Sequence, residues 1–224
     1  MQVVDRIEKR RFVGREFLLW LWFESEIFEA TLSTSVHGSF GLWVERQLAL
    51  SSGKEVTRIK GGSPAGGREA KEALLAGKLP EVASLRITWR DRDLSLTLKA
   101  ERLALSGLKL PTVLDAEPEA PASLAPARPR KKSKRTTVEQ DAEREADERD
   151  ESFYERMALT REVESLVEAL YGDFLALRLG DTWSKVVHPA LTSWASGERG
   201  AAVERYVAAR RGEPKRAKAA KRRS

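Results

Sequence analysis

The sequence contains no cysteine among its 224 residues. Without thiols the chain has no disulfides, iron–sulfur clusters, thiolate zinc sites or cysteine nucleophile. It also has only two histidines, His37 and His188, which lie far apart and show no spacing typical of metal ligands. We therefore expect a protein without a metal, a cofactor or a catalytic site of its own.

Long hydrophobic runs are also missing from the chain. The longest, from Phe17 to Phe23, has seven residues, whereas a helix that crosses a bilayer needs about 20. Charged residues near the N-terminus interrupt the apolar core that a signal peptide requires. These observations predict a protein without a membrane partner, located in the cytoplasm.

Charge is abundant and its balance is basic, with 40 Lys and Arg against 34 Asp and Glu, a net charge of +6 and a pI of about 9.6. A basic balance favours anionic partners such as nucleic acid. Two clusters outside the expected core are nearly free of acids, and we predict that they contact DNA phosphates, which carry no sequence information. Their basic residues are Arg128, Arg130, Lys131, Lys132, Lys134 and Arg135, and then Arg210, Arg211, Lys215, Arg216, Lys218, Lys221, Arg222 and Arg223.

Residues 1–110 show the periodicities of both helices and strands. An apolar stretch at 14–24 predicts a buried helix, and alternation of apolar and polar residues predicts strands. Leu85, Ile87 and Trp89 alternate with polar residues and begin a hairpin, for which Asp91–Asp93 is the expected turn. Further strands are expected at 40–50, 54–60 and 102–110, and a short helix at 68–76.

The remainder divides into a linker, a helical segment and a tail. Residues 111–149 are first rich in Ala and Pro and then charged, which is typical of a disordered linker. Apolar residues at spacings of three and four predict helices over 150–209, with Asp181 as a cap and Pro189 as a possible break. Residues 210–224 form a basic, disordered tail. The expected fold is therefore α+β: a small, mostly antiparallel sheet with packed helices, then a C-terminal helical segment after a disordered linker.

The tryptophans fall into two groups by their phase. Trp20, Trp22 and Trp89 share the phase of the apolar residues around them, which predicts burial. Trp43 alternates out of phase with Leu42 and Val44 and is the best candidate for an exposed or interface aromatic residue.

Over residues 12–110 and 150–180 the ordered set of segments resembles the C-terminal half of the RdgC family of bacterial recombination-associated proteins. The segments that carry the resemblance are Gly14–Phe23, Phe40–Val44, Arg58–Lys60, Ala76–Lys78, Leu85–Leu98, Leu105–Lys109 and Phe174–Leu179.

The resemblance implies a non-catalytic protein of the bacterial nucleoid that binds double-stranded DNA without sequence preference and restrains RecA filaments on it. It implies DNA contacts at Arg58, Lys60 and Lys78, although Gly61 stands where the family usually has a second lysine. Family members form two-contact rings of two copies. The family's N-terminal half has no counterpart here, so a homodimer is expected but a closed ring is doubtful, and the basic clusters would supply additional grip.

Two alternatives stay open. The helix expected from Phe153 to Leu179 suits a protein-interaction module in which the basic tails are incidental. Glu24 and Glu26, together with Asp5, suggest a metal-dependent nuclease, although no lysine accompanies them in the usual nuclease arrangement.

Overall fold

Alternating apolar and polar residues produce a single six-stranded sheet whose neighbouring strands are antiparallel. The computed structural model describes residues 11–61, 67–109, 134–198 and 200–211. Strands follow the order β1-β2-β4-β5-β6, and β3 also pairs with β2. Their bounds are β1 Thr31–Thr34, β2 Gly38–Ser52, β3 Glu55–Gly61, β4 Leu79–Trp89, β5 Arg92–Lys99 and β6 Ala104–Lys109.

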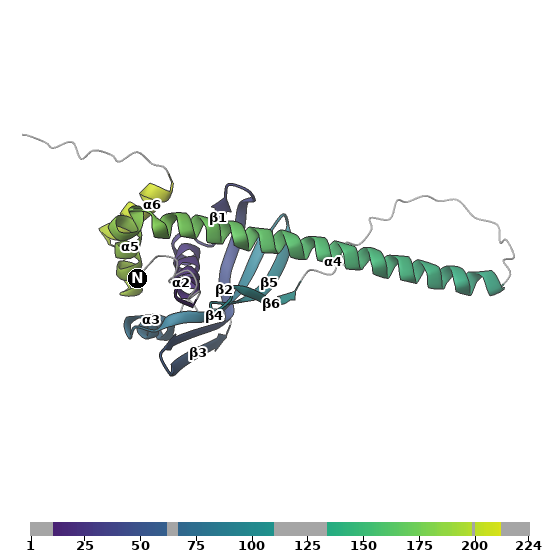
Figure 1. The fold of residues 1–224 in the computed structure, drawn as a ribbon, viewed down its shortest axis with the longest axis horizontal. Helices are drawn as coiled ribbons and strands as arrows, with labels where there is room; N and C mark the ends of the chain where they lie inside the picture. Colours follow the sequence, from purple (N-terminus) through teal and green to yellow (C-terminus); the bar gives the residue numbers. More distant parts are fainter. Residues whose placement is uncertain (1–10, 62–66, 110–133, 199, 212–224) are drawn as a thin grey trace, which may run out of the picture. The chain divides into compact units, whose positions relative to one another are not determined.

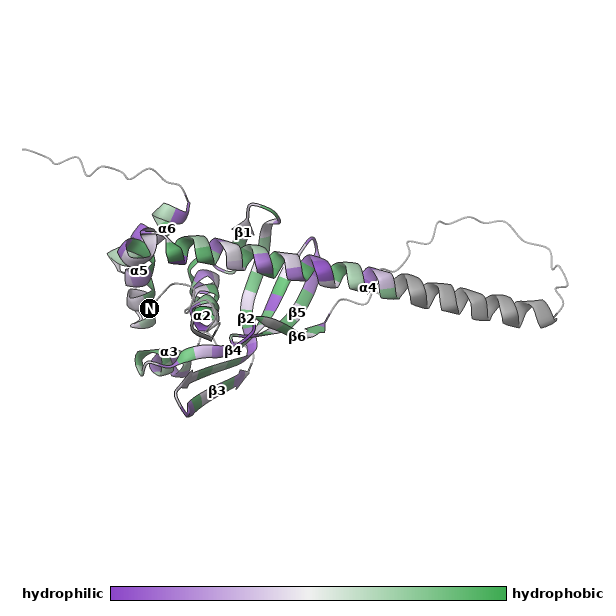
Figure 2. Ribbon diagram, viewed as in Figure 1, coloured by the Kyte–Doolittle hydropathy of each residue, from purple (hydrophilic) through white to green (hydrophobic). Residues whose placement is uncertain are grey.

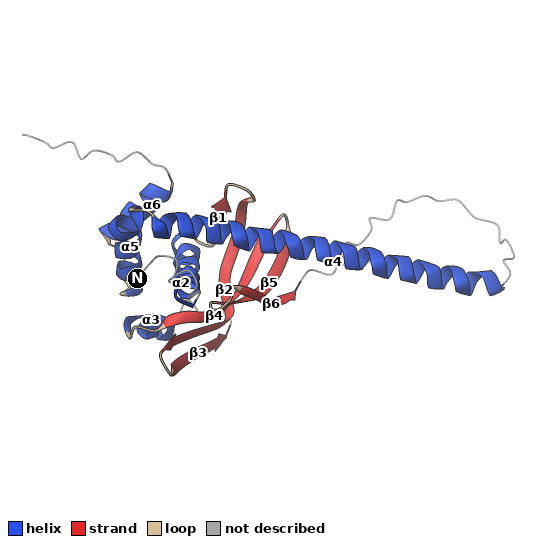
Figure 3. Cartoon of the chain, in the orientation of Figure 1, coloured by secondary structure: helices blue, strands red, loops and turns tan. Residues whose placement is uncertain are grey.

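The helices precede the sheet, interrupt it once and follow it (Figure 3). They comprise α-helices and one π-helical segment, η2. Their bounds are α2 Arg11–Ile27, α3 Arg68–Leu75, α4 Lys134–Leu179, η2 Trp183–Val187, α5 His188–Ala195 and α6 Ala201–Arg210. The α+β class expected from the sequence is confirmed.

Strand β2 organises the sheet because its two halves have different neighbours. Its first half pairs with β1, and its second half pairs with β3, while β4 follows it along both (Figure 1). The register shifts between Val44 and Leu48, where Arg46 adopts a positive φ of 65°. Such a bulge bends the strand. Strand β2 therefore pairs with β1 before the bulge and with β3 after it.

Helix α2 is apolar nearly all round because it is covered on more than one side. Phe17 and Trp20 contact Phe174 of α4, whereas Phe23 contacts Trp194 of α5 and Tyr206 of α6. Helices α2, α5 and α6 lie together beside the sheet (Figure 1). The predicted burial of Trp20, Trp22 and Trp89 is confirmed.

The sheet turns its apolar residues to the side on which α2 packs. Leu42 of β2, Ile87 of β4 and Leu98 of β5 are completely buried, and α2 contacts both β2 and β4. Along each of these strands hydrophobic and hydrophilic residues alternate (Figure 2). The alternate residues that point away from α2 are only partly buried. We call the face opposite α2 the outer face.

The hairpin between β4 and β5 turns earlier than expected. The turn lies at Arg90 and Asp91, which have φ angles of 51° and 60°, and β5 already begins at Arg92. Two consecutive positive φ angles are typical of the tight type I′ turn, which matches the twist of paired strands. The expected turn at Asp91–Asp93 therefore began one residue and ended two residues too late.

The chain does not break at Pro189 but passes from η2 directly into α5. Pro189 lies in the first turn of α5, where its missing N–H is tolerated. Asp181 does not cap a helix with its side chain: the residue before η2 is Thr182, and Asp181 pairs with Lys185 at 3.4 Å.

Helix α4 begins at Lys134, so the interval 134–149, expected as linker, is helical. The reason is compositional, because this interval is rich in Glu, Ala and Arg and contains neither Pro nor Gly. The described residues 134–165 belong to a separate unit, whereas residues 166–198 and 200–211 belong to the unit that contains the sheet.

Candidate nucleic-acid interface

The outer face of the sheet places an aromatic ring and two cations in one cross-strand row. In that row Trp43 of β2 lies opposite Arg86 of β4, Arg86 lies opposite Ser95 of β5, and Ser95 lies opposite Lys109 of β6. The alternation that buries Leu42, Leu85 and Leu96 turns these residues outward. The row therefore runs across four strands on the face that α2 leaves open.

Along this row the outer face is hollowed into a basin of about 220 Å³. Ser84, Ser95 and Thr97 are among its lining residues, and its charged residues are three cations and a single carboxylate. The charged lining consists of Arg46, Arg86, Lys109 and Glu45. With a net charge of +2 from these four residues, the basin attracts anions.

Arg86 is the cation of the basin that is held by two neighbouring side chains. Its guanidinium lies over the Trp43 ring, 4.5 Å from the ring centre, and its Nη1 lies 3.5 Å from Glu45 Oε1. Its Nε is buried, and no hydrogen-bond partner for it occurs in the described part of the chain. Trp43 is partly buried, and its ring passes over Gly41, where a side chain would collide with it. The aromatic residue that the sequence singled out thus orients a cation.

A second row of the same face places cations at the other end of the sheet. Arg58 of β3 lies opposite Ala49, Ala49 opposite Val82, and Val82 opposite Lys99 of β5. Lys60 follows Arg58 on the same face of β3. Arg58, Lys60 and Lys99 are exposed, and no described residue forms an ion pair with them.

Lys78, the third contact implied by the resemblance, is held within the protein. Its Nζ donates a hydrogen bond to Thr57 Oγ1 at 3.1 Å and lies 3.3 Å from Glu55 Oε2. Since Thr57 alternates with Arg58 along β3, Lys78 lies on the opposite face of that strand. The structure brings Arg58 and Lys60 together but does not add Lys78 to them.

The basic clusters lie largely outside the described residues. Lys134 and Arg135 begin α4, but their side chains are not described, and Arg211 is exposed at the end of α6. The predicted contacts that fall outside the described residues are Arg128, Arg130, Lys131, Lys132, Lys215, Arg216, Lys218, Lys221, Arg222 and Arg223.

Arg210 is paired with a buried carboxylate of the folded part rather than free in the tail. Its Nη2 donates to Glu24 Oε2 at 3.2 Å, and Tyr206 donates its hydroxyl hydrogen to the same carboxylate. Trp20 Nε1 donates to the Tyr206 hydroxyl at 3.1 Å. Glu24 is 1% exposed, and burial raises its pKa above the usual value, although Arg210 and the Tyr206 hydrogen bond counteract this.

The Glu24 carboxylate also shifts the pKa values of Tyr206 and Arg210. Burial raises the pKa of Tyr206, and the adjacent Glu24 carboxylate raises it further. Burial, the largest effect, lowers the pKa of Arg210, but Glu24, Tyr206 and Asp173 together raise it by more, so that the net shift is upward. Arg210 therefore stays protonated and links α6 to α2.

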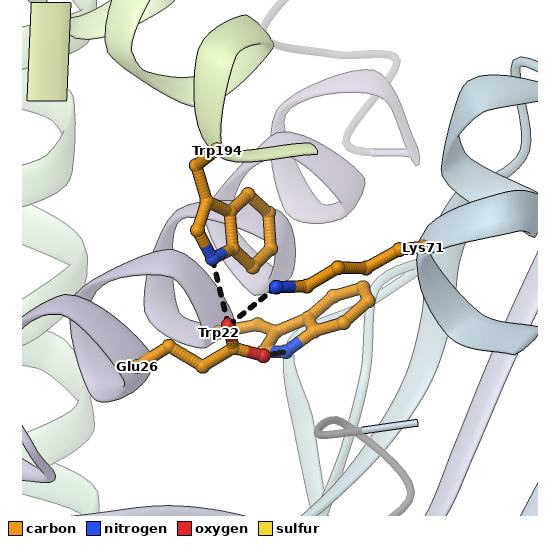
Figure 4. Close-up of polar contacts among 4 residues, drawn as sticks. All are labelled: Trp22, Glu26, Lys71 and Trp194. Atoms are coloured by element: carbon orange, nitrogen blue, oxygen red, sulfur yellow. Dashed lines mark hydrogen bonds and ion pairs between the residues drawn. The ribbon is translucent and has the colours of Figure 1, made fainter. Parts of the chain in front are cut away.

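Glu26, the second carboxylate of the nuclease alternative, is surrounded by three donors (Figure 4). Trp22 Nε1 donates to its Oε1 at 2.7 Å, and Lys71 Nζ and Trp194 Nε1 donate to its Oε2 at 2.9 and 2.8 Å. Lys71 also lies over the Trp194 ring, 5.1 Å from its centre. This cluster ties α3 and α5 to α2.

The two glutamates thus accept hydrogen bonds within the protein and do not converge on one site. Asp5, which would complete the proposed set, lies outside the described residues. Within the described ranges no group of three or more His, Asp or Glu side chains is arranged to hold a metal ion. The roles of Glu24 and Glu26 are explained by packing of the helices.

Sequence reasoning missed Arg46, Arg86, Lys99 and Lys109 as members of the candidate interface. The available signal was the hairpin alternation, in which Arg86 and Lys99 occupy the polar phase. Lys109 and Arg46 gave no such signal. The register between β5 and β6 shifts between Ser95 and Thr97, and Arg46 lies in the bulge of β2.

Within the described residues no helix has both the length and the apolar character needed to span a membrane. Comparisons of the chain with protein-family models, with curated proteins and with solved structures give no match. The function therefore rests on the geometry of the chain's own residues.

Proposed function

We propose that this chain binds duplex DNA through its phosphate backbone, without sequence preference and without a catalytic step. The outer face of the sheet is the proposed folded contact surface. Exposed Arg58, Lys60 and Lys99 form its one end, and the basin with Arg86 and Lys109 forms the other.

The observation that carries the proposal is the exposure of Arg58, Lys60 and Lys99 on one face, with no ion-pair partner among the described residues. Several other cations of the folded unit are matched to a carboxylate, as Arg15 is to Glu81 and Arg178 to Glu16. Cations left unmatched on one face are available to neutralise phosphates and release their counterions.

The wider role proposed here is RdgC-like restraint of RecA filaments on the bacterial nucleoid, and it is supported by the resemblance of the sequence alone. Binding to the duplex would hinder RecA-dependent strand exchange by coating the DNA. The expected result is that strand exchange slows as the protein saturates the duplex. Exchange that proceeds at full rate on saturated duplex would limit the function to DNA binding.

The first test is a double variant, Arg58→Gln/Lys60→Gln, measured by fluorescence anisotropy with random-sequence duplex at several salt concentrations. If both side chains contact phosphates, the slope of log K against log salt becomes shallower by about 1.8, because each phosphate contact contributes about 0.9.

The matched control removes the same charge elsewhere. Arg68 and Lys185 each form an exposed helical pair, with Glu72 at 2.6 Å and Asp181 at 3.4 Å. Arg68→Gln/Lys185→Gln is expected to leave the slope nearly unchanged. Equal slopes for the two double variants would remove the outer face from the proposal.

A truncated chain separates the face from the tail. The shortened chain should keep Arg211 as its last residue. A chain that ended before Arg210 would also lose the contact between Arg210 and Glu24. We expect the shortened protein to bind duplex with a shallower salt slope, as phosphate contacts of the tail are lost.

The protein-interaction module remains a second candidate because α4 exposes large apolar side chains. Phe153 and Tyr154 are 58% and 68% exposed, and Met157 lies one turn further on. Apolar docking persists at high salt, whereas phosphate binding weakens steeply. Salt on the order of 1 M screens exposed charges almost completely. A complex of this chain with a partner, or with a second copy of itself, that persists at this salt concentration would favour the second candidate.

A further inference from the structure

The basin of the outer face has the features of a site for one small anion. It is lined by the cations Arg86 and Lys109 and by Ser95 and Thr97, whose side chains carry hydroxyl groups. At about 220 Å³ it is smaller than the roughly 300 Å³ at which pockets for whole small molecules begin. A single charged group suits this space better than a complete nucleotide.

Arg86 is prepared to bind a tetrahedral oxyanion. Stacking on Trp43 fixes the plane of its guanidinium, and a fixed fork of N–H groups matches a phosphate better than a mobile ammonium does. Its Nε is buried without a hydrogen-bond partner among the described residues. A buried donor left unsatisfied is costly, so Arg86 gains from any shift of its side chain that brings Nε to an acceptor.

The present neighbour of Arg86 is a weak one. Glu45 reaches a single nitrogen, Nη1, at 3.5 Å, and the Arg86 side chain is 41% exposed. Partly exposed pairs of this kind contribute little to stability because water and salt screen them. Glu45 can therefore leave Arg86 at small cost when a stronger anion arrives.

We propose that the basin binds one phosphate group through Arg86 and Lys109, and that Glu45 holds Arg86 until the phosphate displaces it. Glu45 then acts as a built-in competitor that weakens phosphate binding. The assignment of this phosphate to a nucleic-acid backbone rests on the proposed function, whereas the site itself does not.

The test compares two substitutions of opposite expected sign in the full chain. Glu45→Gln removes the competitor, and the affinity for phosphate is expected to rise about twofold to fivefold, the range of a screened ion pair. Arg86→Gln removes the anchor, and the affinity is expected to fall about tenfold or more, as for lost hydrogen bonds to a charged group.

Matched controls separate the site from the general field of the protein. Glu72→Gln and Arg68→Gln remove one charge each from an exposed helical pair on α3, which lies away from the basin. If Glu45→Gln behaves like Glu72→Gln, or Arg86→Gln behaves like Arg68→Gln, the proposal is overturned.

Two probes distinguish the sources of the phosphate. Inorganic phosphate, titrated while the amide and side-chain NMR signals of the basin are followed, reports the site alone. Random-sequence duplex, followed by anisotropy, reports backbone phosphate. Opposite effects of Glu45→Gln and Arg86→Gln on both probes support the whole proposal.

Other outcomes are also decisive. Effects on inorganic phosphate without effects on duplex would keep the site and reject its assignment to a nucleic-acid backbone. If in addition Arg58→Gln/Lys60→Gln leaves duplex binding unchanged, the proposed function fails while the phosphate site stands. No change with either probe rejects the site and leaves the contribution of Arg58 and Lys60 to be judged by their own salt slope.

Discussion

Replacing Arg210 with glutamine is expected to destabilise the protein by about 3 kcal/mol near pH 7.5, and by clearly less near pH 5. The substitution leaves Glu24 buried without its counter-charge, and removing one partner of a buried pair typically costs about 3–5 kcal/mol. The lower end applies because the Arg210 side chain is 30% exposed. Urea or thermal unfolding at the two pH values measures the effect.

The pH dependence follows from the direction of the Glu24 pKa. Burial raises this pKa in the folded protein above the usual value of 4.5, so ionised Glu24 costs stability at neutral pH and the cost disappears as pH falls through the folded pKa. Without Arg210, which lowers the pKa, the folded pKa rises further. The deficit of the variant is therefore largest above that pKa and shrinks on acidification.

Arg211→Gln is the control, since Arg211 is the next residue and is exposed at the end of α6. It is expected to change stability by less than about 0.5 kcal/mol. The double variant Glu24→Gln/Arg210→Gln removes both charges and should recover part of the lost stability. A deficit of Arg210→Gln that is independent of pH would contradict the buried-pair explanation.

The variants Arg210→Gln and Arg211→Gln also test whether Arg210 contacts DNA. The sequence grouped Arg210 with the basic tail, but the structure pairs it with Glu24 and stacks it 5.9 Å from the Trp20 ring centre. We expect Arg210→Gln to reduce duplex binding no more than Arg211→Gln does, when both are measured well below their unfolding temperatures.

Replacing Gly14 with alanine is expected to lower stability by about 2 kcal/mol or more, although alanine normally favours a helix by about 1 kcal/mol over glycine. Gly14 lies in α2 where the helix passes over the chain at Ala100. An added Cβ would stand 2.8 Å from the Ala100 carbonyl carbon and still closer to its oxygen. Because the obstacle is backbone, no side-chain rotation relieves it, and α2 has to move off the sheet.

The control for Gly14 is Gly172→Ala, within helix α4. Nothing lies within 4 Å of a Cβ added at Gly172, so only the helix preference acts, and stability is expected to rise by about 0.5–1 kcal/mol. Thermal unfolding should show a decrease of about 4–8 °C for Gly14→Ala and a small increase for Gly172→Ala. Equal shifts of the same sign would show that α2 does not pack as closely as described.

Much of the fold could be predicted from local patterns. The helix at Arg68, the hairpin of β4 and β5 and the strand around Leu42 follow from periodicity, because each buries one face of a regular element. β1 was missed because Thr31–Thr34 is a four-residue edge strand, too short to establish a period. The position of the tight turn at Arg90 and Asp91 was predicted incorrectly. Neither residue is a glycine, the residue type that usually indicates positive φ angles in such turns.

The candidate site could be predicted only in part. Arg58 and Lys60 lie on one strand, and their shared face follows from a spacing of two residues. Arg86, Lys99 and Lys109 join them only through the pairing of β4, β5 and β6, which depends on register. Register is decided by burial of a whole strand face, and a local window of sequence does not contain it.

The sequence by itself determined the α+β class, the basic balance, the absence of thiol chemistry and the burial of most tryptophans, because composition and local periodicity suffice for these properties. Only the tertiary structure decided which charges are available. Arg210 and Lys78 are matched within the protein, and Arg58, Lys60 and Lys99 are not, because a carboxylate reaches the first two from elsewhere in the chain. Charge pairing depends on distances of a few ångströms between distant residues, and chain folding alone sets them.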